Sequence, residues 1–394
     1  MSYSLVKLYE LLQSPSRNGL TKPKAIRGSG VKMIAMGEIF ANSILDTRIN
    51  MDRVPINEKE LKNYSIQPQD ILFARQSLVL DGAGKCVIVK NIVEQTVFES
   101  HLIRIRINQK KANPYFIYYL FNSSLGKNKI RSITEQVAAA GIRGSDLIKL
   151  EIPCPELNIQ NKIAAILIAL DEKIFLNKQI NDNLQQHLNL LFFQIFTNII
   201  PDIALGEVVE TTSGGTPSRK HKEYYENGSI CWIKSKELLG SYIHDTEEHI
   251  NDLALSKSST KMLPEHSVLI AMYGATVGAY GIISKQMTCN QAICALLSNE
   301  NYPYTYLFQI AHEQQQNLIN MAVGSAQQNI SQALVKQLYI HSDIDAIKKF
   351  HKLAQPLHQQ IQCLERENKT LSEVRDTLLP KLMSGELDVS ELDI

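Results

Sequence analysis

The 394-residue chain repeats one plan of sequence elements twice, and this repeat limits its possible folds more than any other feature. "VKMIAMGEIF" at 31–40 resembles "ICWIKSKELL" at 230–239 in the second half. "NPYFIYYLF" at 113–121 resembles "YPYTYLFQI" at 302–310, and further matches occur in the same order at a period of roughly 190 residues. Two unrelated domains with similar turns are the alternative, but the shared order of matches favours a duplicated unit.

Within each half, short apolar runs of strand length alternate with turns and a few helical patterns, and each half ends in a long helical pattern. We therefore expect the α+β class: two similar mixed α/β globular domains separated by an antiparallel two-helix coiled coil, with a pseudo-two-fold internal repeat. The expected boundaries are a first globular domain at 1–155, a central helix at 156–199, a second globular domain at 200–342, and a C-terminal helix and tail at 343–394.

The two long helical patterns carry narrow apolar seams, in which the spacing between seam residues alternates between four and three. In the first pattern the seam runs through Ile163, Leu167, Leu170, Ile174, Leu184 and Leu188. In the second it runs through Leu357, Ile361, Leu364, Asn368, Leu371 and Leu378. Such a seam predicts a coiled coil. Two amphipathic helices that each cover their own domain are the alternative.

Polar residues interrupt these seams at Asn177, Asn181 and Asn368. Because the short linker "NIIPDIA" joins the first helix to the second globular domain and the second helix leaves that domain, we expect antiparallel pairing. The register that aligns the apolar residues sets Asn177 against Asn368. A shift by one heptad would leave each of them opposite an apolar side chain, at a cost of about 1–3 kcal/mol. The asparagines are therefore predicted to fix the register, with Arg375 against Leu170 as a weak layer unless the guanidinium reaches outward.

Composition excludes several classes of protein. The formal net charge is +1, so a basic surface must be local. Six cysteines occur without C-x-x-C pairs or nearby histidines, which argues against a structural zinc site and against a secreted disulfide framework. The N-terminus lacks the apolar region of a signal peptide, and no run approaches the roughly 20 apolar residues of a membrane span. We expect a soluble, cytoplasmic protein.

The sequence contains no recognisable catalytic motif. "NPYF" lacks the second proline of the N-P-P-Y/F loop of adenine methyltransferases, and the glycines of "DGAGKCVIV" precede a strand instead of following one. No P-loop is present, and the histidines form no evident triad or metal set. We therefore expect no catalytic residue, no metal ligand and no cofactor in this chain.

Basic, glycine-rich loops open both halves of the chain. In the first half, "SRNGLTKPKAIRGSGVK" carries Arg17, Lys22, Lys24 and Arg27. In the second half, "TTSGGTPSRKHKEYYENG" carries Ser213, Gly214, Gly215, Thr216, Ser218, Arg219, Lys220 and Lys222. Glycines, small hydroxyls and neighbouring cations are what phosphate contacts require. The alternative is a charged loop that is simply solvated.

Other polar residues are placed where they could read bases. These candidates are Arg75 and Gln76 after one strand, Tyr273 after its counterpart, and the amides Gln327, Gln328 and Asn329. Amide side chains can pair with adenine through two hydrogen bonds. Capping of the next helix by Asn329 or Ser331 is an equally good interpretation of that segment. A long coiled coil between two such domains would suit two sites on one duplex DNA.

The sequence resembles the specificity (S) subunits of type I restriction-modification systems over nearly its whole length. The resemblance rests on the repeat, on "SGGTPSRKHKEYYENGSICWIKSKEL", on "GSAQQNIS" and on "VRDTLLPKLMSGEL" near the C-terminus. The first half lacks "GGTP" and has "SPSRNGLTKP" instead, so it should read a different half-site.

The resemblance implies two target recognition domains, each reading one half of a split DNA sequence at a spacing set by the paired helices. It also implies docking of two methyltransferase (modification) subunits and of restriction/translocase subunits. S-adenosylmethionine, ATP and Mg would be used by those partners, and this chain would be a non-catalytic recognition subunit. The resemblance adds Arg143 and the segment Lys234, Ser235 and Lys236 to the expected DNA contacts.

A second function class is compatible with the same pattern. A structural adaptor could use the coiled coil to bridge two protein partners without touching DNA.

Overall fold

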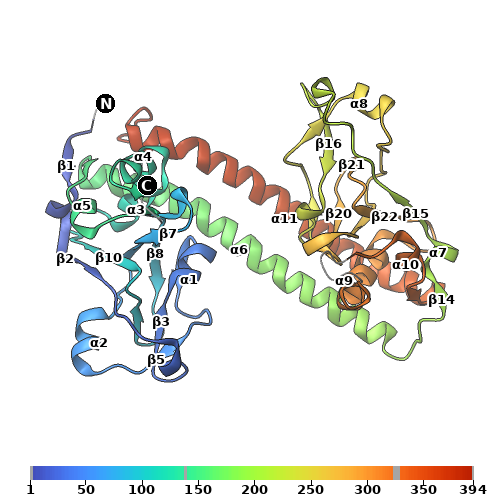
Figure 1. Ribbon diagram of the computed structural model, residues 1–394, viewed down its shortest axis with the longest axis horizontal. Coiled ribbons are helices and arrows are strands. Elements are labelled where there is room, and N and C mark those ends of the chain that lie inside the picture. The colour runs from blue at the N-terminus through green and yellow to red at the C-terminus, as the bar shows by residue number, and fades with distance from the viewer. Residues whose placement is uncertain (1–2, 137–139, 323–328, 393–394) are drawn as a thin grey trace. The chain divides into compact units, whose positions relative to one another are not determined.

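The computed structural model describes residues 3–136, 140–322 and 329–392 and divides into two compact units (Figure 1). Unit 1 comprises Met1–Lys173 with Thr370–Ile394, and unit 2 comprises Ile174–Lys369. Two long helices, α6 (Leu157–Phe196) and α11 (Ile344–Ser384), contribute residues to both units. No helix among the described residues is long and apolar enough to cross a membrane.

Unit 1 is built from short strands and helices that precede α6. In chain order these are β1 (Leu5–Lys7), η1 (Leu8–Leu11), β2 (Leu12–Asn18), η2 (Lys24–Ile26), β3 (Val31–Ile34), α1 (Met36–Ala41), β4 (Ile44–Asp46), β5 (Arg53–Val54), α2 (Glu58–Tyr64), β6 (Ile71–Ala74), β7 (Gln76–Ser77), η3 (Leu80–Gly82), β8 (Cys86–Asn91), β9 (Thr96–Phe98), β10 (Leu102–Ile107), α3 (Pro114–Asn122), α4 (Ser124–Ser132), β11 (Glu135–Gln136), β12 (Ala140–Gly141), α5 (Gly144–Leu147) and β13 (Glu151–Pro153).

Unit 2 follows the same plan between α6 and α11. Its elements are β14 (Ile203–Ala204), α7 (Leu205–Val208), β15 (Glu210–Ser213), η4 (Lys222–Tyr224), β16 (Ile230–Ile233), η5 (Ser235–Glu237), β17 (Tyr242–Ile243), β18 (His249–Ile250), α8 (Asp252–Lys257), β19 (Val268–Ala271), η6 (Gly274–Thr276), β20 (Tyr280–Ile283), β21 (Thr288–Cys289), β22 (Ile293–Leu297), α9 (Tyr304–Met321), α10 (Gln332–Lys336) and β23 (Tyr339–Ile340).

The five-stranded sheet and one three-stranded sheet have the same topology in the two units. A five-stranded sheet has the order β2-β10-β6-β8-β4 in unit 1 and β15-β22-β19-β20-β17 in unit 2. Each has one parallel pair at the same edge, β4 with β8 and β17 with β20. A three-stranded sheet has the order β5-β3-β9 in unit 1 and β18-β16-β21 in unit 2, with the last pair parallel in both. The predicted α+β class and internal repeat are confirmed.

One helix of each unit packs on the five-stranded sheet and begins as the sequence leads one to expect. In unit 1 this helix is α3, where Pro114 occupies the first turn and the Asn113 side chain accepts hydrogen bonds from the amides of the next turn. In unit 2 it is α9, which begins one residue after Pro303. Pro114 is thus the first residue of α3, whereas Pro303 is the cap residue just before α9.

The long helices belong to the cores of both units. In unit 1, Ile163 of α6 and Leu382 of α11 are fully buried in one apolar cluster with Phe116 of α3. In unit 2, Leu188 of α6 and Phe350 of α11 are fully buried in one cluster with the residues of α9 and β19. Neither helix covers only the domain that precedes it, so each unit needs one segment of both helices to complete its core.

The two helices run antiparallel within unit 2, in the predicted register. The Nδ2 atom of Asn177 donates a hydrogen bond to the Oδ1 atom of Asn368 at 3.0 Å. Further along, the rings of Phe192 and Phe350 have their centroids 5.4 Å apart. Asn177 is fully buried and also donates to the Oε2 atom of Glu367 at 2.7 Å. The predicted contact between Asn177 and Asn368 is therefore confirmed.

Two other polar seam residues behave differently from this pair. The Oδ1 atom of Asn181 is buried and has no hydrogen-bond partner among the described residues. Arg375 in unit 1 was expected to escape outward, but its guanidinium pairs with Asp171 at 2.8 Å and with Asp376 at 2.9 Å. Asp171 also accepts a hydrogen bond from the Tyr119 hydroxyl at 2.7 Å. Arg375 was expected to weaken this layer of the helix pair, but the ion pair with Asp171 neutralises its charge.

Replacing one asparagine of the seam should destabilise the protein, and replacing both should not. In Asn177→Leu, the amide of Asn368 faces an apolar side chain, which should lower the free energy of unfolding by about 1–3 kcal/mol. In the double variant, which also carries Asn368→Leu, an apolar layer forms, and the protein should regain most of the lost free energy of unfolding. Urea unfolding of the two single variants and the double variant measures the coupling. Additive losses would contradict a direct pairing of the two side chains.

Unit 2 contains nine of the ten histidines of the chain, and two of them, His341 and His358, are buried. His358 of α11 is fully buried, and its Nδ1 atom lies 3.1 Å from the Tyr242 hydroxyl. Burial lowers the pKa of His358 to about 3, and the nearby His266 and His351 rings add to this effect. Because no carboxylate pairs with His358 in the described contacts, its protonation would place an uncompensated charge in the core.

Unit 2 should therefore be more acid-sensitive than unit 1. Below the unfolded pKa of about 6.5, the unfolded chain takes up a proton at His358 that the folded chain rejects, so stability falls as the pH falls toward 3. The cost should reach about 2 kcal/mol at pH 5. Hydrogen exchange of α9 and of the first half of α11, corrected for intrinsic rates, measures it. His358→Gln should weaken this dependence, whereas an equal response of both units would contradict the assignment.

Candidate nucleic-acid interface

The glycine-rich loop of unit 2 is fixed by close backbone packing. The amide of Gly214 donates to the carbonyl of Ile293 at 3.3 Å, and that of Gly215 donates to the carbonyl of Cys289 at 2.9 Å. A Cβ atom on Gly214 would lie 2.1 Å from the Cys289 carbonyl oxygen. Ser213, which precedes them, donates through its hydroxyl to Gln332 at 2.9 Å. Close contacts inside the protein therefore explain why both positions are glycine. The same contacts fix the direction in which the loop leaves β15.

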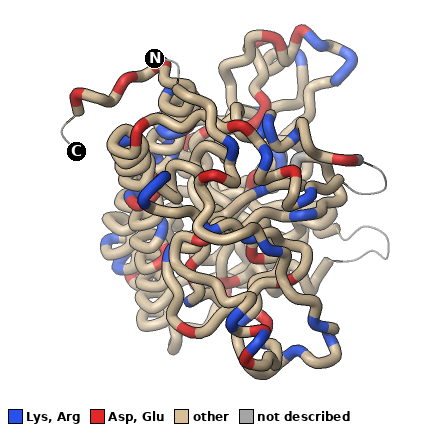
Figure 2. Tube along the Cα trace, turned by 90° about the vertical axis from the view of Figure 1, so that its left-hand side faces the viewer, with Lys and Arg blue, Asp and Glu red and all other residues tan. Residues whose placement is uncertain are grey.

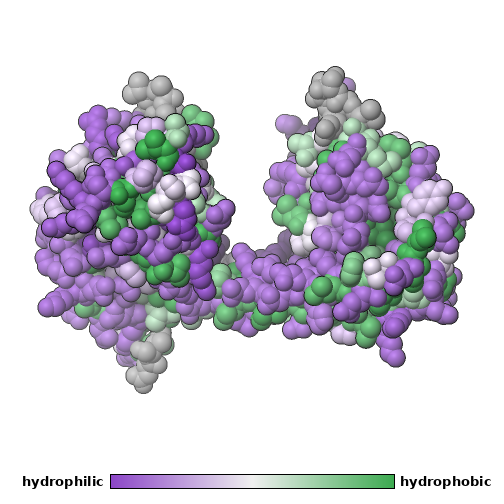
Figure 3. Space-filling view, turned by 90° about the horizontal axis from the view of Figure 1, so that it is seen from below, coloured by the Kyte–Doolittle hydropathy of each residue, from purple (hydrophilic) through white to green (hydrophobic). Residues whose placement is uncertain are grey.

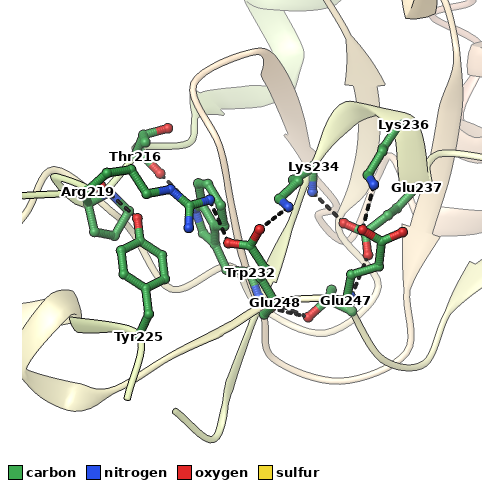
Figure 4. A network of polar contacts seen from close by, with 12 residues as sticks. Thr216, Arg219, Tyr225, Trp232, Lys234, Lys236, Glu237, Glu247 and Glu248 are labelled. Carbon is green, nitrogen blue, oxygen red and sulfur yellow. Dashed lines mark hydrogen bonds and ion pairs between the residues drawn. The ribbon is translucent and has the colours of Figure 1, made fainter. Parts of the chain in front are cut away.

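An aromatic bracket holds the next part of this loop (Figure 4). The indole of Trp232 donates to the carbonyl oxygen of Gly215 at 2.9 Å. The Arg219 guanidinium lies 4.3 Å from the centre of the Tyr225 ring and 5.3 Å from that of Trp232. At these distances the rings attract the cation and restrict its orientation. Arg219 is thus a positioned cation.

One carboxylate neutralises two of the predicted DNA-contact cations. Arg219 pairs with Glu248 at 2.5 Å, and Lys234 pairs with the other oxygen of the same carboxylate. Burial raises the pKa of Glu248, but the hydrogen bonds from Lys234 and Arg219 outweigh it and hold the pKa below its ordinary value. The group of three therefore carries one net positive charge at neutral pH.

The segment after Lys234 is also neutralised locally. Lys236 pairs with Glu247 at 2.5 Å, and this hydrogen bond raises the pKa of Lys236. Ser235 begins η5, which is capped because Glu237 accepts a hydrogen bond from the Lys234 amide at 2.7 Å. The same Glu237 accepts from the Glu247 amide at 2.9 Å (Figure 4). These contacts give the segment a structural role, and its contact with DNA stays a prediction.

The cations at the tip of the loop have no such partners. Lys220 and Lys222 are exposed, and no acidic group pairs with either of them in the described part of the chain. Thr216 and Ser218 are exposed beside them; Thr216 donates to Gln291, and the Ser218 hydroxyl accepts from the Lys220 amide at 3.4 Å. Lys220 and Lys222 are therefore the cations of this loop most available to a phosphate.

Tyr273 and Asn329 were predicted as separate candidates for base contacts, and a backbone β-bridge pairs them. Tyr273 is 40% exposed, and Asn329 is also exposed. Ser331 caps α10 through a hydrogen bond from the Leu334 amide at 3.2 Å, so the capping interpretation of this segment is confirmed for Ser331, and Asn329 is not the cap. Gln327 and Gln328 lie outside the described residues.

The basic loop of unit 1 is largely neutralised by residues distant in sequence. Lys22 pairs with Glu60 at 2.9 Å, and Arg27 pairs with Asp52 at 3.0 Å. Lys24 is exposed in η2 and has no acidic partner in the described ranges. Arg17 belongs to the edge strand β2, and its guanidinium lies 5.8 Å from the centre of the Tyr64 ring. Among these four cations, Lys24 and Arg17 are left to meet an external anion.

A second group of predicted residues in unit 1 lies around β7. The carbonyl of Arg75 accepts from the Ile142 amide at 2.9 Å, and Gln76 pairs with the residue before Ile142 on β12. Arg143 follows and pairs with the exposed Glu135 at 2.8 Å. His101, which the sequence did not single out, lies 3.2 Å from the Gln76 side chain.

The β7 region of unit 1 corresponds to the Tyr273 region of unit 2. In unit 2 the carbonyl of Met272 accepts from the Ile330 amide at 2.9 Å, as Arg75 does from Ile142. No hydrogen bond or ion pair joins the β7 group to Lys22, Lys24 or Arg27 within the part of the chain described. Unit 1 therefore holds its candidate residues in two separate groups.

A cluster of potential metal ligands lies beside β16, although the sequence predicted none. Cys231 and His249 are opposite residues on the paired strands β16 and β18, and their side chains approach Asp245. The Asp245 carboxylate lies 2.8 Å from the His249 ring and 2.8 Å from the Lys369 ammonium. Strand pairing unites residues with no recognisable sequence spacing, and Lys369 already compensates the carboxylate.

The surface charge of each unit is mixed. Figure 2 shows Lys and Arg interspersed with Asp and Glu along the chain, in agreement with the ion pairs above. Figure 3 shows mainly hydrophilic surface with small groups of hydrophobic residues. The ion pairs described above thus neutralise part of the charge of the predicted basic residues.

Comparison with known proteins gives a consistent family. The family model described as "Type I restriction modification DNA specificity domain" matches residues 3–186 and again residues 202–374. A type I restriction enzyme specificity subunit (MjaIX) of Methanocaldococcus jannaschii is 25% identical over 302 residues, covering 70% of each chain. The HindI specificity subunit of Haemophilus influenzae is 22% identical over 441 residues, covering 91% of this chain and 94% of the relative.

A solved structure shares the fold. The S subunit of a type I restriction-modification system from M. genitalium aligns over 99% of this chain and 97% of its own, with a TM-score of 0.59 and 17% identity. The family model covers most of the chain in two copies, and each copy coincides with one run of the repeated topology. The chain therefore belongs to the family of type I restriction-modification DNA specificity proteins.

Proposed function

We propose that this chain is the non-catalytic recognition subunit of a type I restriction-modification complex and that it reads a two-part DNA target, one part with each unit. The observation that carries this proposal is that the family's DNA specificity domain occurs twice, on two units with the same sheet topology. The two units place different side chains at equivalent positions, such as Gln76 and Tyr273, so their half-sites should differ in sequence.

The spacing between the two half-sites would be set by α6 and α11. Both helices are continuous through residues assigned to the two units, and apolar layers and the Asn177–Asn368 pair fix their register in unit 2. A continuous helix transmits a change of length as about 1.5 Å per residue. Helix length, and not loop flexibility, would then determine the spacing.

Partner subunits would supply the chemistry. Two methyltransferase subunits would methylate adenine with S-adenosylmethionine, and restriction/translocase subunits would use ATP and Mg. Exposed apolar residues on α6 in unit 2, such as Leu176, Leu190 and Phe193, offer a surface for docking. The alternative of an adaptor without DNA contact is less well supported, because the matched family is a DNA specificity family.

Removing the free cations of the unit 2 loop should weaken DNA binding through its electrostatic part. Lys220→Ala with Lys222→Ala should lower affinity for cognate and unrelated duplexes alike, and reduce the slope of log affinity against log salt by about 2. Arg219 is left in place because its loss would remove one of the two cations that pair with Glu248. The salt dependence is measured on the assembled complex of this chain with its methyltransferase subunits.

The matched control is Lys236→Ala, because Lys236 already pairs with Glu247. It should change the slope by much less than the double variant. An unchanged slope in the double variant would show that the tip of the loop does not contact phosphates.

Lengthening both helices should change the spacing of the target and neither half-site. One heptad added to α6 after Lys173 and one added to α11 after Lys369 keep the seam in phase and extend each helix by about 10 Å. Since duplex DNA rises about 3.4 Å per base pair, the two methylated half-sites should move about 3 base pairs apart. Sequencing that detects methylated adenine measures the spacing, and an altered half-site at the old spacing would contradict the proposal.

A further inference from the structure

Three potential metal ligands meet at one oxygen atom beside β16. The Oδ1 atom of Asp245 lies 2.8 Å from the Nε2 atom of His249 and 3.5 Å from the Sγ atom of Cys231. The three ligand atoms all lie within 4.8 Å of one another. A cysteine sulfur, a histidine nitrogen and a carboxylate oxygen are the ligand types of protein-bound zinc. The residue types and their grouping therefore fit a zinc site.

The distances within this group are close to those around a coordinated ion. Zinc binds sulfur at about 2.3 Å and nitrogen or oxygen at about 2.0–2.2 Å, so the ligand atoms of a tetrahedral site lie about 3.3–3.6 Å apart. The distance of 3.5 Å between Cys231 and Asp245 is within this range. The distance of 2.8 Å between Asp245 and His249 has to widen by about 0.6 Å. Both of these side chains are partly exposed, so a small rotation can provide this change.

The Oδ1 atom of Asp245 is approached by more hydrogen atoms than it has lone pairs to accept them. The amide of Thr246 donates to it at 3.0 Å, in addition to the contacts from His249 and Cys231. A carboxylate oxygen has about two lone pairs, so three donors compete for two acceptor positions. A metal ion bound to the sulfur, the ring nitrogen and Oδ1 would remove two of these donors and leave the Thr246 amide in place.

The other oxygen of Asp245 has a different partner. The Lys369 ammonium donates to Oδ2 at 2.8 Å. Lys369 therefore pairs with a different oxygen from the one that Cys231 and His249 approach. A ligating carboxylate is typically hydrogen-bonded to a further group, which fixes its orientation. The ion pair with Lys369 can thus persist when Oδ1 binds a metal ion.

Unit 1 joins the equivalent strands with ion pairs. β3 pairs with β5 as β16 pairs with β18, and Lys32 lies opposite Arg53 as Cys231 lies opposite His249. In unit 1 both cations pair with Glu94, at 3.1 Å and 2.8 Å. Unit 2 has two metal-ligand residue types in place of the two cations. A bound metal ion would therefore restore positive charge at the same place in the fold.

We propose that Cys231, Asp245 and His249 bind one zinc ion, with a water molecule as the fourth ligand. Cys231 would bind as the thiolate, and its proton would leave to solvent as the ion enters. Zinc has no redox chemistry, so the ion would be structural in this chain. This inference goes beyond the proposed function and does not depend on it, because metal binding is measured without DNA.

The ion would fix both ends of a segment that positions two predicted DNA-contact cations. The segment 245–249 begins and ends with two of the three ligands. Within it, Glu248 pairs with Arg219 and with Lys234 (Figure 4). Zinc bound at both ends of the segment would restrict the backbone on either side of this carboxylate. The metal site would thereby order the ion pairs at the base of the unit 2 loop.

The test loads the full chain with cobalt after a chelator has removed bound metal. Cobalt replaces zinc in tetrahedral sites and makes them visible by absorption. We expect one cobalt ion per chain, with the visible bands of a tetrahedral ion and a near-ultraviolet charge-transfer band from one thiolate ligand. Zinc added in excess should displace the cobalt and remove these bands.

Three variants assign the ligands. Cys231→Ala keeps a small apolar side chain in the core and should abolish the thiolate band. His249→Gln keeps a polar side chain at a partly exposed position and should weaken cobalt binding by at least about 10-fold. Cys363→Ser is the matched control, because Cys363 is exposed on α11 and lies outside the cluster. Its spectrum should equal that of the wild type. The thermal midpoint of each variant without metal shows whether it is folded.

Hydrogen exchange measures the ordering of the segment 245–249 independently of any variant. With free zinc at about 100 times its dissociation constant, exchange in this segment of the wild-type chain should slow by about 100-fold. Exchange in β5 of unit 1, where Arg53 pairs with Glu94 instead, should not change.

The outcomes decide the proposal without reference to DNA. A folded wild-type chain that binds no cobalt, or a thiolate band that persists in folded Cys231→Ala, would overturn the zinc site. A band that is lost in Cys363→Ser and kept in Cys231→Ala would show adventitious binding at the exposed cysteine and would also overturn it. The proposed function would stand in each case, since it rests on the repeated specificity domain.

Discussion

The pairing of α6 with α11 is the interaction on which the rest of the structure depends. Each unit buries one segment of both helices, so neither five-stranded sheet has a complete core without the pair. The Asn177–Asn368 hydrogen bond contributes little net free energy, but any other register would bury an unpaired amide. Each unit therefore requires the two helices to pair in one register. In unit 1 the ion pair of Arg375 with Asp171 helps to fix that register.

Local neutralisation explains how a chain of net charge +1 can present a nucleic-acid surface. Glu60 and Glu248 position the long side chains of Lys22, Lys234 and Arg219 and cancel part of their charge. Cations without acidic partners, such as Lys220 at the tip of the unit 2 loop, are then displayed against a nearly neutral background. Such a surface binds DNA only where shape and base contacts add to the electrostatic term, which favours specific over non-specific binding.

The sequence predicted features that depend on local spacing and missed those that depend on distant pairing. The strand that ends at Ala74 and the register of Asn177 with Asn368 follow from periodicity, repeat and turn signals, and both are present. Nothing in the loop sequence indicates that Glu248 neutralises Arg219, because the two residues meet only through the pairing of β16 with β18. The glycines of that loop were expected to admit a phosphate, yet backbone packing inside the protein already requires them.

The central claim is that two units of one chain read two separate half-sites. The most direct measurement is genome-wide mapping of methylated adenine in a host that lacks other adenine methyltransferases and expresses this chain with its methyltransferase subunits. The account predicts a single motif made of two different short sequences separated by a fixed number of unspecified base pairs. A contiguous motif, or an assembled complex that methylates adenine without any sequence preference, would contradict it.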